Sequence, residues 1–394
     1  MSTIATTTSQ FWRQFKEELI AAAPSMGIDK LGITSAEPFV ELKRQLQSHR
    51  ELGYESGFED PDLDKRTDPR LSMPEAQSII SIAVAYPSKL KDAPVSEPGR
   101  RRGILSRSAW GEDYHVALRR RMDKLEAWIK ERFPDAKLMS MIDTGALADR
   151  AVAERAGIGW SGKNCSVITP ELGSWVYLGE MLTELPLPPD EQIADGCGDC
   201  TRCIDACPTG ALVGPGQLNS QRCISYITQT KGFVEEELMM KIGNRLYGCD
   251  TCQIVCPVNR GIDIRIHDEL AADPEVVKPL LRPLLQLGNR DFKAQFGNSS
   301  AAWRGRKPIQ RNALIGLGNF KDAGSIPDIA VVLKGDPRPV LRGTAAWALG
   351  RIGDQSAMVE LEAALETELE LEVQEAIVRA ISQLNKVHNK TEHQ

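Results

Sequence analysis

Eight of the nine cysteines in this 394-residue chain fall in two runs and in the segment between them. The first run, CGDCTRCIDACP, extends from Cys197 to Pro208 with the spacing C-x2-C-x2-C-x3-C-P. The second run, CDTCQIVCP, extends from Cys249 to Pro257 and lacks one cysteine, which Cys223 can supply. Because this spacing is typical of chains that bind 4Fe-4S clusters through thiolates, the sequence predicts two such clusters.

In this pattern, the last cysteine of a run binds the cluster whose other ligands come from the other run. The first cluster is therefore assigned to Cys197, Cys200, Cys203 and Cys256. The second is assigned to Cys207, Cys223, Cys249 and Cys252. The ninth cysteine, Cys165, is expected to be a buried apolar thiol.

Two other uses of these cysteines explain the spacing less well. Four-cysteine zinc sites favour two C-x2-C pairs, which leaves the positions of Cys203, Cys207 and Cys256 unexplained. Disulfides are typical of secreted proteins, whereas the N-terminus shows no secretory signal. No stretch is apolar for the length that a membrane span needs. We therefore expect a cytoplasmic protein.

The elements expected before the cysteines are alternating helices and strands. Helical spacing of apolar residues predicts helices over 9–25 and 113–133. The apolar run SIISIAVAYP, residues 78–87, predicts a buried strand. Residues 138–182 predict a strand, a turn, a helix, a glycine-rich turn and two strands.

Several polar side chains lie at the ends of these elements. Arg66 is in a segment rich in Gly, Pro and Asp, residues 54–71, which is expected to be a loop. The Arg66 side chain either contacts an anion or is simply solvated. Tyr114 and His115 begin the second helix, where free N–H groups favour anions; a surface aromatic and a core histidine are the alternatives. Asp143 ends a strand, where ligand sites collect in α/β folds, although a lone aspartate there also serves as a helix cap.

The C-terminal part repeats at a fixed interval. RNALIGLGNF begins at Arg311, RGTAAWALGRIGD at Arg342 and VQEAIVRAI at Val373, each 31 residues after the one before. This pattern indicates paired-helix repeats of the HEAT type, which stack and often bind macromolecules. With a proline-rich boundary at 182–190, the length suggests three domains, over residues 1–185, 186–270 and 271–394.

A net charge of −6 gives the chain no overall basic field, so any nucleic-acid surface must be local. The candidate is WRGRKPIQR, which includes Trp303, Arg304, Arg306 and Lys307. Basic side chains next to an aromatic suit phosphate contacts. The alternative is a solvated helix end.

The order of these parts resembles the epoxyqueuosine reductases, cobalamin-dependent enzymes that complete queuosine in tRNA. The resemblance covers nearly the whole chain and rests on LDKRTDPR, AWGEDYH, IDTGALADRAVAERAGIGWSGKN, the cysteine pattern and the repeats. It implies a multidomain α/β + α fold with three parts. These are a nitroreductase-like α/β cobalamin domain, a bacterial-ferredoxin-like module with two 4Fe-4S clusters, and HEAT-like helical repeats that help to hold the tRNA anticodon stem-loop.

The resemblance also implies roles for particular residues. Asp143 would be the proton donor, with a pKa raised by burial beside the corrin, and Tyr114 and Arg150 would orient the epoxide substrate. Cofactor contacts are expected from Arg66, Asp143, Ser161, Lys163, Asn164, Asp250 and Thr251. Electrons would pass from an external low-potential donor through the clusters to cob(I)alamin.

A histidine ligand to cobalt is not expected. Corrinoid sites of that kind use D-x-H-x-x-G, and the nearest run, which begins at Asp113, has Leu118 in place of the glycine.

Two other functions explain part of the sequence. A corrinoid iron-sulfur reductive dehalogenase would share the cofactors, but the twin-arginine export signal is missing and the repeats have no use on a small organohalide. An electron-transfer ferredoxin joined to a repeat scaffold would bind clusters and no corrinoid. A monomeric reductase whose partners are tRNA and an electron donor uses every part of the chain.

Overall fold

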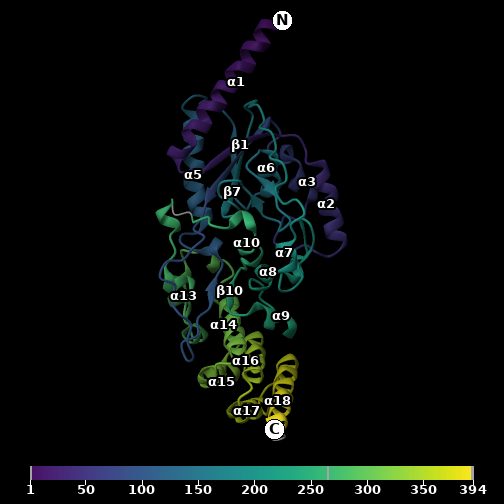
Figure 1. The fold of residues 1–394 in the computed structure, drawn as a ribbon, viewed down its shortest axis with the longest axis vertical. Helices are drawn as coiled ribbons and strands as arrows, with labels where there is room; N and C mark the ends of the chain where they lie inside the picture. The colour runs from purple at the N-terminus through teal and green to yellow at the C-terminus, as the bar shows by residue number, and fades with distance from the viewer. Residues whose placement is uncertain (1, 264–265, 392–394) are drawn as a thin grey trace. The chain divides into compact units, whose positions relative to one another are not determined.

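The computed structural model describes residues 2–263 and 266–391 (Figure 1). The chain forms two compact units, each assembled from three separate segments. Unit 1 comprises Met1–Lys89, Glu112–Gln221 and Thr251–Ala271. Unit 2 comprises Leu90–Gly111, Arg222–Asp250 and Ala272–Gln394. The predicted domain boundaries stay a prediction.

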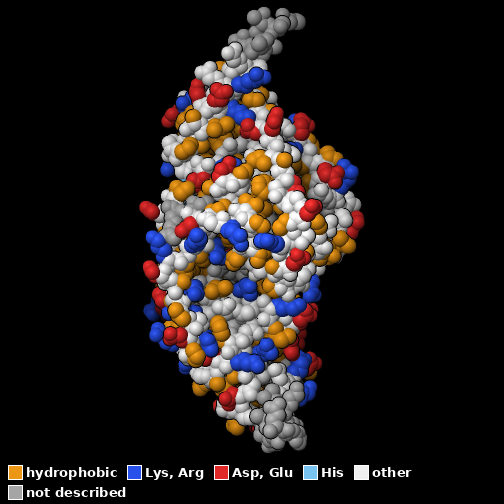
Figure 2. Space-filling model, viewed as in Figure 1, with side chains coloured by type: hydrophobic (Ala, Val, Ile, Leu, Met, Phe, Trp, Pro, Cys, Tyr) orange, Lys and Arg blue, Asp and Glu red, His pale blue; other side chains and the backbone are white. Residues whose placement is uncertain are grey.

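Acidic and basic side chains are intermixed over the visible surface (Figure 2), as a modest net charge of −6 would suggest. Within the described residues, the search for a helix long and apolar enough to cross a membrane found none.

Unit 1 is built on a four-stranded antiparallel sheet with the order β1-β2-β7-β4. Its strands are β1 (Lys30–Ser35), β2 (Ser78–Ala85), β7 (Val176–Thr183) and β4 (Leu138–Met141). Every residue of β2 is buried, which confirms the strand predicted from its apolar run. The sheet is antiparallel, so the argument from strand ends of open parallel sheets does not explain the position of Asp143.

Helices cover both faces of this sheet. On one face, Ile80 and Ile82 of β2 share a core with residues of α1 (Ser2–Ala22) and α5 (Tyr114–Lys130). On the other face, Ile79 and Ala83 pack in two smaller clusters that include residues of α6 (Asp149–Arg155). The split follows from the strand period of two, which sends neighbouring side chains to opposite faces.

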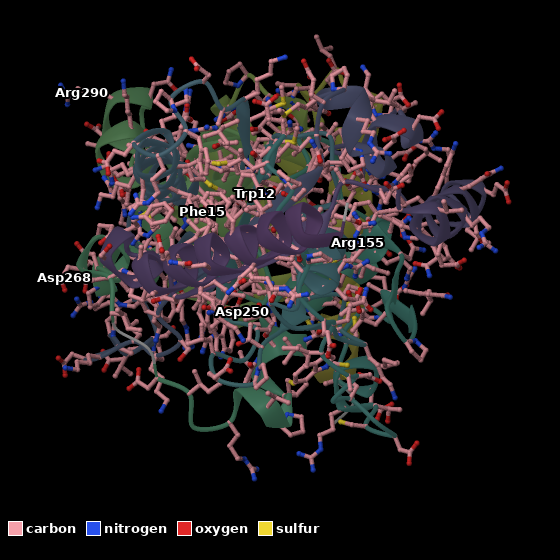
Figure 3. The ribbon with its side chains drawn as sticks, turned by 90° about the horizontal axis from the view of Figure 1, so that it is seen from above. Trp12, Phe15, Arg155, Asp250, Asp268 and Arg290 are labelled. Atoms are coloured by element: carbon pink, nitrogen blue, oxygen red, sulfur yellow. The ribbon has the colours of Figure 1, made fainter. Side chains whose placement is uncertain are left out.

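The first helix is held by aromatic packing to Phe133, which lies three residues after the end of α5. Trp12 stacks on Phe133 with ring centroids 5.4 Å apart, and Phe15 meets Phe133 edge to face at 5.0 Å. Trp12 and Phe15 are one turn apart on α1 (Figure 3), so both rings reach the same partner. The helices predicted over 9–25 and 113–133 are therefore confirmed.

Helix α6 lies very close to β1 at Gly32. A Cβ built on Gly32 would stand 2.1 Å from the backbone oxygen of Ala156, next to the C-terminal end of α6. Only glycine leaves room for this approach. The close contact fixes how α6 crosses the sheet, and therefore where its first residue, Asp149, lies.

The segment predicted as a loop over 54–71 contains two short helices, α3 (Leu63–Thr67) and α4 (Pro69–Ser72). The prediction was wrong here because the same residues that favour turns also cap helices. Asp62 accepts hydrogen bonds from two N–H groups of α3, and Asp68 accepts one from α4, whose first residue is proline.

The remaining elements of unit 1 are short. Strands β5 (Trp160–Ser161) and β6 (Val167–Ile168) pair around the glycine-rich turn. The cysteine-rich runs contribute α7 (Arg202–Asp205) and α10 (Thr251–Ile254), and between the runs β8 (Leu212–Gly214) pairs with β9 (Gln217–Leu218).

Unit 2 ends in stacked helix pairs at the predicted interval. The helices are α14 (Arg306–Phe320), α15 (Ile326–Gly335), α16 (Pro339–Ile352), α17 (Met358–Leu365) and α18 (Leu371–Thr391). Helix α14 packs on α16, and α16 packs on α18. A Cβ on Gly318 would lie 3.0 Å from the Cα of Ala348, and one on Gly350 would lie 2.7 Å from the Cα of Ala380. The same small-residue contact thus recurs 32 residues later along the chain.

Before these helices, unit 2 contains short elements. They are β3 (Ile104–Leu105), α8 (Ile224–Ile227), α9 (Glu236–Ile242), β10 (Arg245–Tyr247), α11 (Pro274–Val277), α12 (Leu281–Leu285) and α13 (Asn289–Phe296). Strands β3 and β10 pair in parallel.

A buried arginine joins these short elements to α14. Arg311 is 0% exposed, and its guanidinium donates to the backbone oxygens of Ile227, Thr230 and Gly232 at 2.6 to 2.9 Å. Asn312 beside it donates to the oxygens of Thr228 and Leu246, each at 2.8 Å. Burial lowers the pKa of Arg311 to about 10, so the side chain remains charged at neutral pH.

We expect Arg311→Met to destabilise unit 2 strongly. The substitution leaves several buried carbonyl oxygens without a donor, and each charge-assisted bond contributes about 1.5–3 kcal/mol. The midpoint of thermal unfolding should fall by several degrees. Arg290→Met is the matched control, because Arg290 is 92% exposed on α13. Equal midpoints for the two variants would contradict a structural role for Arg311.

Candidate active site and cluster site

Asp143 lies two residues after β4 ends, in a turn where its φ angle is +54°. This left-handed conformation is uncommon outside glycine, although aspartate tolerates it better than most residues. The Tyr114 hydroxyl donates a hydrogen bond to Oδ2 of Asp143, and Nε2 of His115 stands 3.5 Å from the same oxygen. The Asp143 side chain is 59% exposed. The turn therefore presents a carboxylate that is held in place and open to a substrate.

The first turn of α5 supplies both partners of Asp143. The rings of Tyr114 and His115 stack with centroids 4.1 Å apart, and Tyr114 also stacks on Tyr177 at 4.9 Å. Asp113 caps the helix by accepting the N–H of His115, and it also faces Nδ1 of His115 at 2.8 Å. Both ring nitrogens of this partly exposed histidine therefore face carboxylates, so it is not a core histidine.

The pKa values of His115 and Asp143 are shifted in opposite directions. Hydrogen bonds to Asp113 and Asp143 raise the pKa of His115 to about 9. The hydrogen bond from His115 in turn lowers the pKa of Asp143, although burial opposes the change. The predicted rise in the pKa of Asp143 depends on burial beside a corrin and stays a prediction, whereas in the protein alone the adjacent imidazolium keeps this pKa low. At neutral pH, the mobile proton of this group is held on His115.

A cavity of about 220 Å³ is also part of unit 1. It is lined by Tyr86, Arg150, Cys165, Ser166, Val167, Ser174, Val176, Leu178 and Gln253. Arg150 donates to the backbone oxygen of Cys165 at 3.2 Å, and burial raises the pKa of the Cys165 thiol. Cys165 is partly buried rather than fully buried, has a φ of +65°, and lines the cavity beside the Arg150 guanidinium, so its surroundings are less apolar than expected.

Gln253 joins the second cysteine run to this cavity. Its Nε2 donates to the Tyr86 hydroxyl at 3.1 Å and to the backbone oxygen of Ser174 at 2.9 Å. Asn259 donates to the Ser174 hydroxyl and to the backbone oxygen of Gln253 at 2.8 and 2.7 Å. Tyr86, Ser174 and Gln253 were not among the residues predicted from the sequence. Only the position of Gln253, directly after a predicted cluster ligand, could have drawn attention to it.

Three predicted cofactor-binding residues lie around β5 and the following turn. Ser161 donates to Glu154 at 2.8 Å, and Lys163 donates to the backbone oxygen of Gly198. Asn164 is buried, and its Oδ1 accepts the N–H of Ser166 at 3.1 Å. Its Nδ2 has no hydrogen-bond partner within the described structure. A buried donor of this kind fits a ligand that brings its own acceptor.

The other three residues predicted to contact the cofactor are Arg66, Asp250 and Thr251. Arg66, on α3, stands 3.9 Å from Glu55, and burial lowers its pKa. Asp250 belongs to unit 2, where Arg107 binds it at 2.8 Å through its guanidinium and at 3.0 Å through its backbone N–H. Thr251 is the first residue of α10 in unit 1. These three do not belong to the set that lines the cavity.

The cysteines predicted to bind the first cluster gather within unit 1. Cys203 is close enough to Cys197 and Cys256 for each thiolate to raise its pKa, after the larger effect of burial. Cys256 responds in the same way to Cys197 and Cys200. No three His, Cys, Asp or Glu side chains of the described chain converge on a single ion. Four neighbouring cysteine thiolates are the usual ligands of a 4Fe-4S cluster.

The second predicted set is divided between the units. Cys207 and Cys252 belong to unit 1, whereas Cys223 and Cys249 belong to unit 2. Burial would raise the pKa of Cys207, but hydrogen bonds with the backbone around Thr209 and Leu212 outweigh it and lower the pKa. A thiol with a lowered pKa is suited to metal binding as the thiolate.

The predicted basic surface lies in unit 2, before and within the first turn of α14. Trp303 is 51% exposed, and the guanidinium of Arg304 lies 4.8 Å from the centre of its ring. Arg304 also donates to the backbone oxygen of Gln229, and Arg306 donates to Asn289 at 2.6 Å. Burial and then the charges of Arg338, Arg311 and Lys231 lower the pKa of Lys307. Cations therefore gather around Lys307.

Three family models match the chain. The model described as "Epoxyqueuosine reductase QueG, DUF1730" matches residues 66–144, a 4Fe-4S double cluster binding domain matches residues 196–259, and HEAT repeats match residues 304–382. The last two confirm the predicted two-cluster module and helical repeats.

Relatives and solved structures match almost the whole length. The chain is 58% identical over 373 residues to an epoxyqueuosine reductase of Bacillus cereus, covering 95% of this chain and 98% of the relative. A crystal structure of an epoxyqueuosine reductase with an epoxyqueuosine-modified tRNA-Tyr stem loop aligns with a TM-score of 0.93 and 57% identity, over 95% and 100% of the two chains. A Bacillus subtilis structure with its aspartate catalytic loop swung out of the active site aligns with a TM-score of 0.92 and 56% identity, over 95% and 100%.

We expect His115 to titrate near pH 9, because two carboxylates stabilise its charged form. In an NMR titration, Asp143→Asn should move this pKa toward the ordinary value of about 6.5, while Asp113 retains part of the shift. Asp123→Asn is the control, because Asp123 is an exposed residue of the same helix. An ordinary pKa for His115 in the unaltered protein would contradict this electrostatic description.

The raised pKa of His115 also makes the stability of the folded protein depend on pH. The folded pKa of His115 lies above its unfolded value, so this contribution to stability is fully present below about pH 6.5. It is lost as the pH rises through about 9.

Proposed function

Because the chain belongs to the epoxyqueuosine reductase family, we propose that it reduces epoxyqueuosine in tRNA to queuosine. The observation that carries the proposal is the Asp143 carboxylate held by Tyr114 and His115 in the unit that also contains the first set of cluster cysteines. This arrangement combines a proton donor with a site for low-potential electrons, and the reaction needs both.

The proposed reaction defines what the protein must supply. Converting an epoxide to an alkene breaks both of its carbon–oxygen bonds and forms a carbon–carbon double bond. Two electrons enter and two protons are consumed, and the oxygen leaves as water. Electrons arrive one at a time through 4Fe-4S clusters, so a group that delivers both to the substrate must stand between clusters and epoxide.

Cobalamin is the group that we propose for this step, and when bound it supplies a strongly nucleophilic metal centre that stores two electrons. Arg150, Cys165 and Gln253 line the cavity in the same unit, and Asn164 offers a buried donor without a partner. Ser161, Lys163, Arg66, Asp250 and Thr251 remain proposed contacts. The cavity of about 220 Å³ would receive only part of so large a group.

For the clusters, we propose the ligand sets that the cysteine spacing predicts. The first is Cys197, Cys200, Cys203 and Cys256, and the second is Cys207, Cys223, Cys249 and Cys252. The pKa changes of Cys203 and Cys256 support the first set, since they arise in part from neighbouring thiolates.

The protein's own residues can move the proton. His115 carries it near neutral pH, and its Nε2 stands 3.5 Å from Oδ2 of Asp143. Asp143 has too low a pKa to hold a proton for long, so we propose that it passes a proton from His115 to the epoxide oxygen as charge develops there. Tyr114 orients the carboxylate through its hydroxyl, and Arg150 is the proposed partner for the hydroxyl groups of the substrate.

The proposed partners are a tRNA carrying epoxyqueuosine and a low-potential electron donor. The cations around Lys307 and the exposed ring of Trp303 support a tRNA contact in unit 2. We propose that the protein acts in the cytoplasm, where reducing conditions suit cysteine-bound clusters.

Asp143→Asn should lower the rate of epoxide reduction about 100-fold or more, because the amide cannot donate an acidic proton. Iron content, corrinoid binding and tRNA affinity should be unchanged, since the side-chain shape is kept. The measurement is a single-turnover assay on tRNA carrying the epoxide, with anaerobically purified protein and Asp123→Asn as control. Full activity of Asp143→Asn would remove the proposed proton-transfer role.

Lys307→Gln should weaken tRNA binding modestly, and by the same factor for tRNAs of different sequence. If Lys307 meets a phosphate, the slope of log K against log salt should lose about one unit. Lys307→Gln tests a phosphate contact more directly than changes at Arg304 or Arg306, because those two side chains also form hydrogen bonds within unit 2. Lys386→Gln on α18 is the control, because Lys386 is exposed. Identical salt slopes for the two variants would place the tRNA contact elsewhere.

A further inference from the structure

Three tyrosine rings of unit 1 stack in a row that ends at the proposed proton donor. The rings of Tyr86 and Tyr177 have centroids 4.5 Å apart and an interplanar angle of 34°. The rings of Tyr177 and Tyr114 have centroids 4.9 Å apart and are nearly parallel, at 15°. The Tyr114 hydroxyl then donates a hydrogen bond to Oδ2 of Asp143. Direct contacts therefore connect the core of unit 1 to this carboxylate at every step.

The register of the sheet places the first two rings of the row next to each other. Tyr177 is on β7 opposite Val84 of β2, and Tyr86 follows two residues after Val84. Residues two apart on a strand share a face, and aromatic rings reach diagonal neighbours across a strand pair. Both tyrosines are buried in the core that α5 covers. The first residue of α5, Tyr114, therefore packs on Tyr177.

Hydrogen bonds hold the inner end of the row. Nε2 of Gln253 donates to the Tyr86 hydroxyl at 3.1 Å, and also to the hydroxyl and the backbone oxygen of Ser174 at 3.1 and 2.9 Å. Nδ2 of Asn259 donates to the backbone oxygen of Gln253 at 2.7 Å, and its Oδ1 accepts the N–H of Ser174 at 2.8 Å. Movement of the Tyr86 ring would therefore break a hydrogen bond in a region with little access to water.

The outer end of the row contacts the groups proposed to move the proton. The Tyr114 ring stacks on His115, with centroids 4.1 Å apart, as well as on Tyr177. The Asp143 side chain is 59% exposed, so its direction depends on the few side chains that bind it. The Tyr114 hydroxyl is one of these, and its oxygen lies in the plane of its own ring. Whatever fixes that plane therefore also fixes where the hydroxyl points.

We infer that Tyr177 is a positioning residue for the proposed proton transfer, because its buried ring fixes the plane of Tyr114 and so directs the Tyr114 hydroxyl at Asp143. Tyr177 acts through Tyr114, while Tyr86 supports the Tyr177 ring from the core. The kinetic part of this inference rests on the proposed function. The part that concerns ring positions does not depend on which reaction the protein catalyses.

Filling the core does not by itself account for this row. Three of the chain's six tyrosines lie in it, although leucine or phenylalanine would fill core positions without a polar atom. Stacked rings also add an orientational preference that aliphatic side chains lack. Elsewhere in the same core, Phe15 of α1 meets Phe133 edge to face. Phe15 is therefore an aromatic core residue outside the row, with which Tyr177 can be compared.

The test uses two substitutions of Tyr177 and a control. Tyr177→Phe keeps the stacked ring, whereas Tyr177→Leu removes it. Phe15→Leu is the matched control, because Phe15 is 4% exposed and Tyr177 is 6% exposed in the same core. Both leucine variants should lower the midpoint of thermal unfolding, since each removes a buried ring. A property that changes only in Tyr177→Leu therefore reports on positioning and not on stability.

The position of the Tyr114 ring can be measured without an activity assay. In NMR spectra of the unaltered protein, ring currents of the stacked Tyr114 side chain should shift the signals of the His115 ring protons. Tyr177→Leu should change these shifts, because the Tyr114 ring loses the surface on which it is stacked. Tyr177→Phe and Phe15→Leu should leave them as they are in the unaltered protein.

The reductase assay tests the kinetic part. In single turnovers, Tyr177→Leu should slow epoxide reduction about 10-fold or more with unchanged tRNA affinity, as expected when a catalytic group is misplaced. Tyr177→Phe and Phe15→Leu should keep the rate. A double-mutant cycle with Tyr114→Phe tests the route of the effect. Once Tyr114→Phe has removed the hydroxyl, adding Tyr177→Leu should slow the reaction no further.

The inference is overturned if Tyr177→Leu leaves the His115 signals unchanged, or if Phe15→Leu moves them as far. A slow Tyr177→Phe, or fully additive effects of Tyr177→Leu and Tyr114→Phe, would also overturn it. If the unaltered protein fails to reduce epoxyqueuosine, the proposed function fails, while the NMR comparison still decides whether Tyr177 holds Tyr114. If Tyr177→Leu does not fold, Tyr177→Met replaces it in each comparison, because methionine adapts to irregular core spaces without a ring.

Discussion

A carboxylate held in a left-handed turn is the constraint on which the active site depends. Asp143 has a φ of +54° and follows an edge strand, so local sequence preference alone would not hold it there. Tyr114 donates a hydrogen bond to its carboxylate, and Nε2 of His115 stands 3.5 Å from the same oxygen. Both residues belong to the first turn of α5, so this helix end holds the Asp143 side chain in place.

In the proposed reaction, this arrangement would separate the storage of a proton from its delivery. His115 has a pKa of about 9 because it lies between two carboxylates, and it therefore remains protonated across the physiological range. Asp143 has a lowered pKa, so a proton on it would be given away readily. The proposed mechanism thus has His115 reload Asp143, and Asp143 pass the proton to the epoxide oxygen.

Buried polar groups also join segments that are far apart in the sequence. In unit 1, Arg121 binds the backbone oxygen of Gly27 and the carboxylate of Glu269, each at 2.7 Å, and His267 pairs with Asp29 at 2.8 Å. In unit 2, Arg311 binds three backbone oxygens that precede α14 by about eighty residues. Apolar contacts alone tolerate small shifts of one segment along another. A buried donor that loses its acceptor, in contrast, lowers the free energy of unfolding. These contacts therefore specify how the separated segments assemble.

Features that depend on spacing along the chain could be predicted from the order of the amino acids. The cysteine runs, the strand from Ser78, the two long helices of unit 1 and the 31-residue repeat are all periodic or local patterns, and the structure and the family matches confirm them. Which side chains share a charge environment became visible only in the folded protein. The lowered pKa of Asp143 beside His115 and the position of Cys165 beside Arg150 arise between residues that no sequence period relates. Electrostatic and hydrogen-bonding effects depend on distance and burial in space, and those are set only when the sheet and its helices have packed.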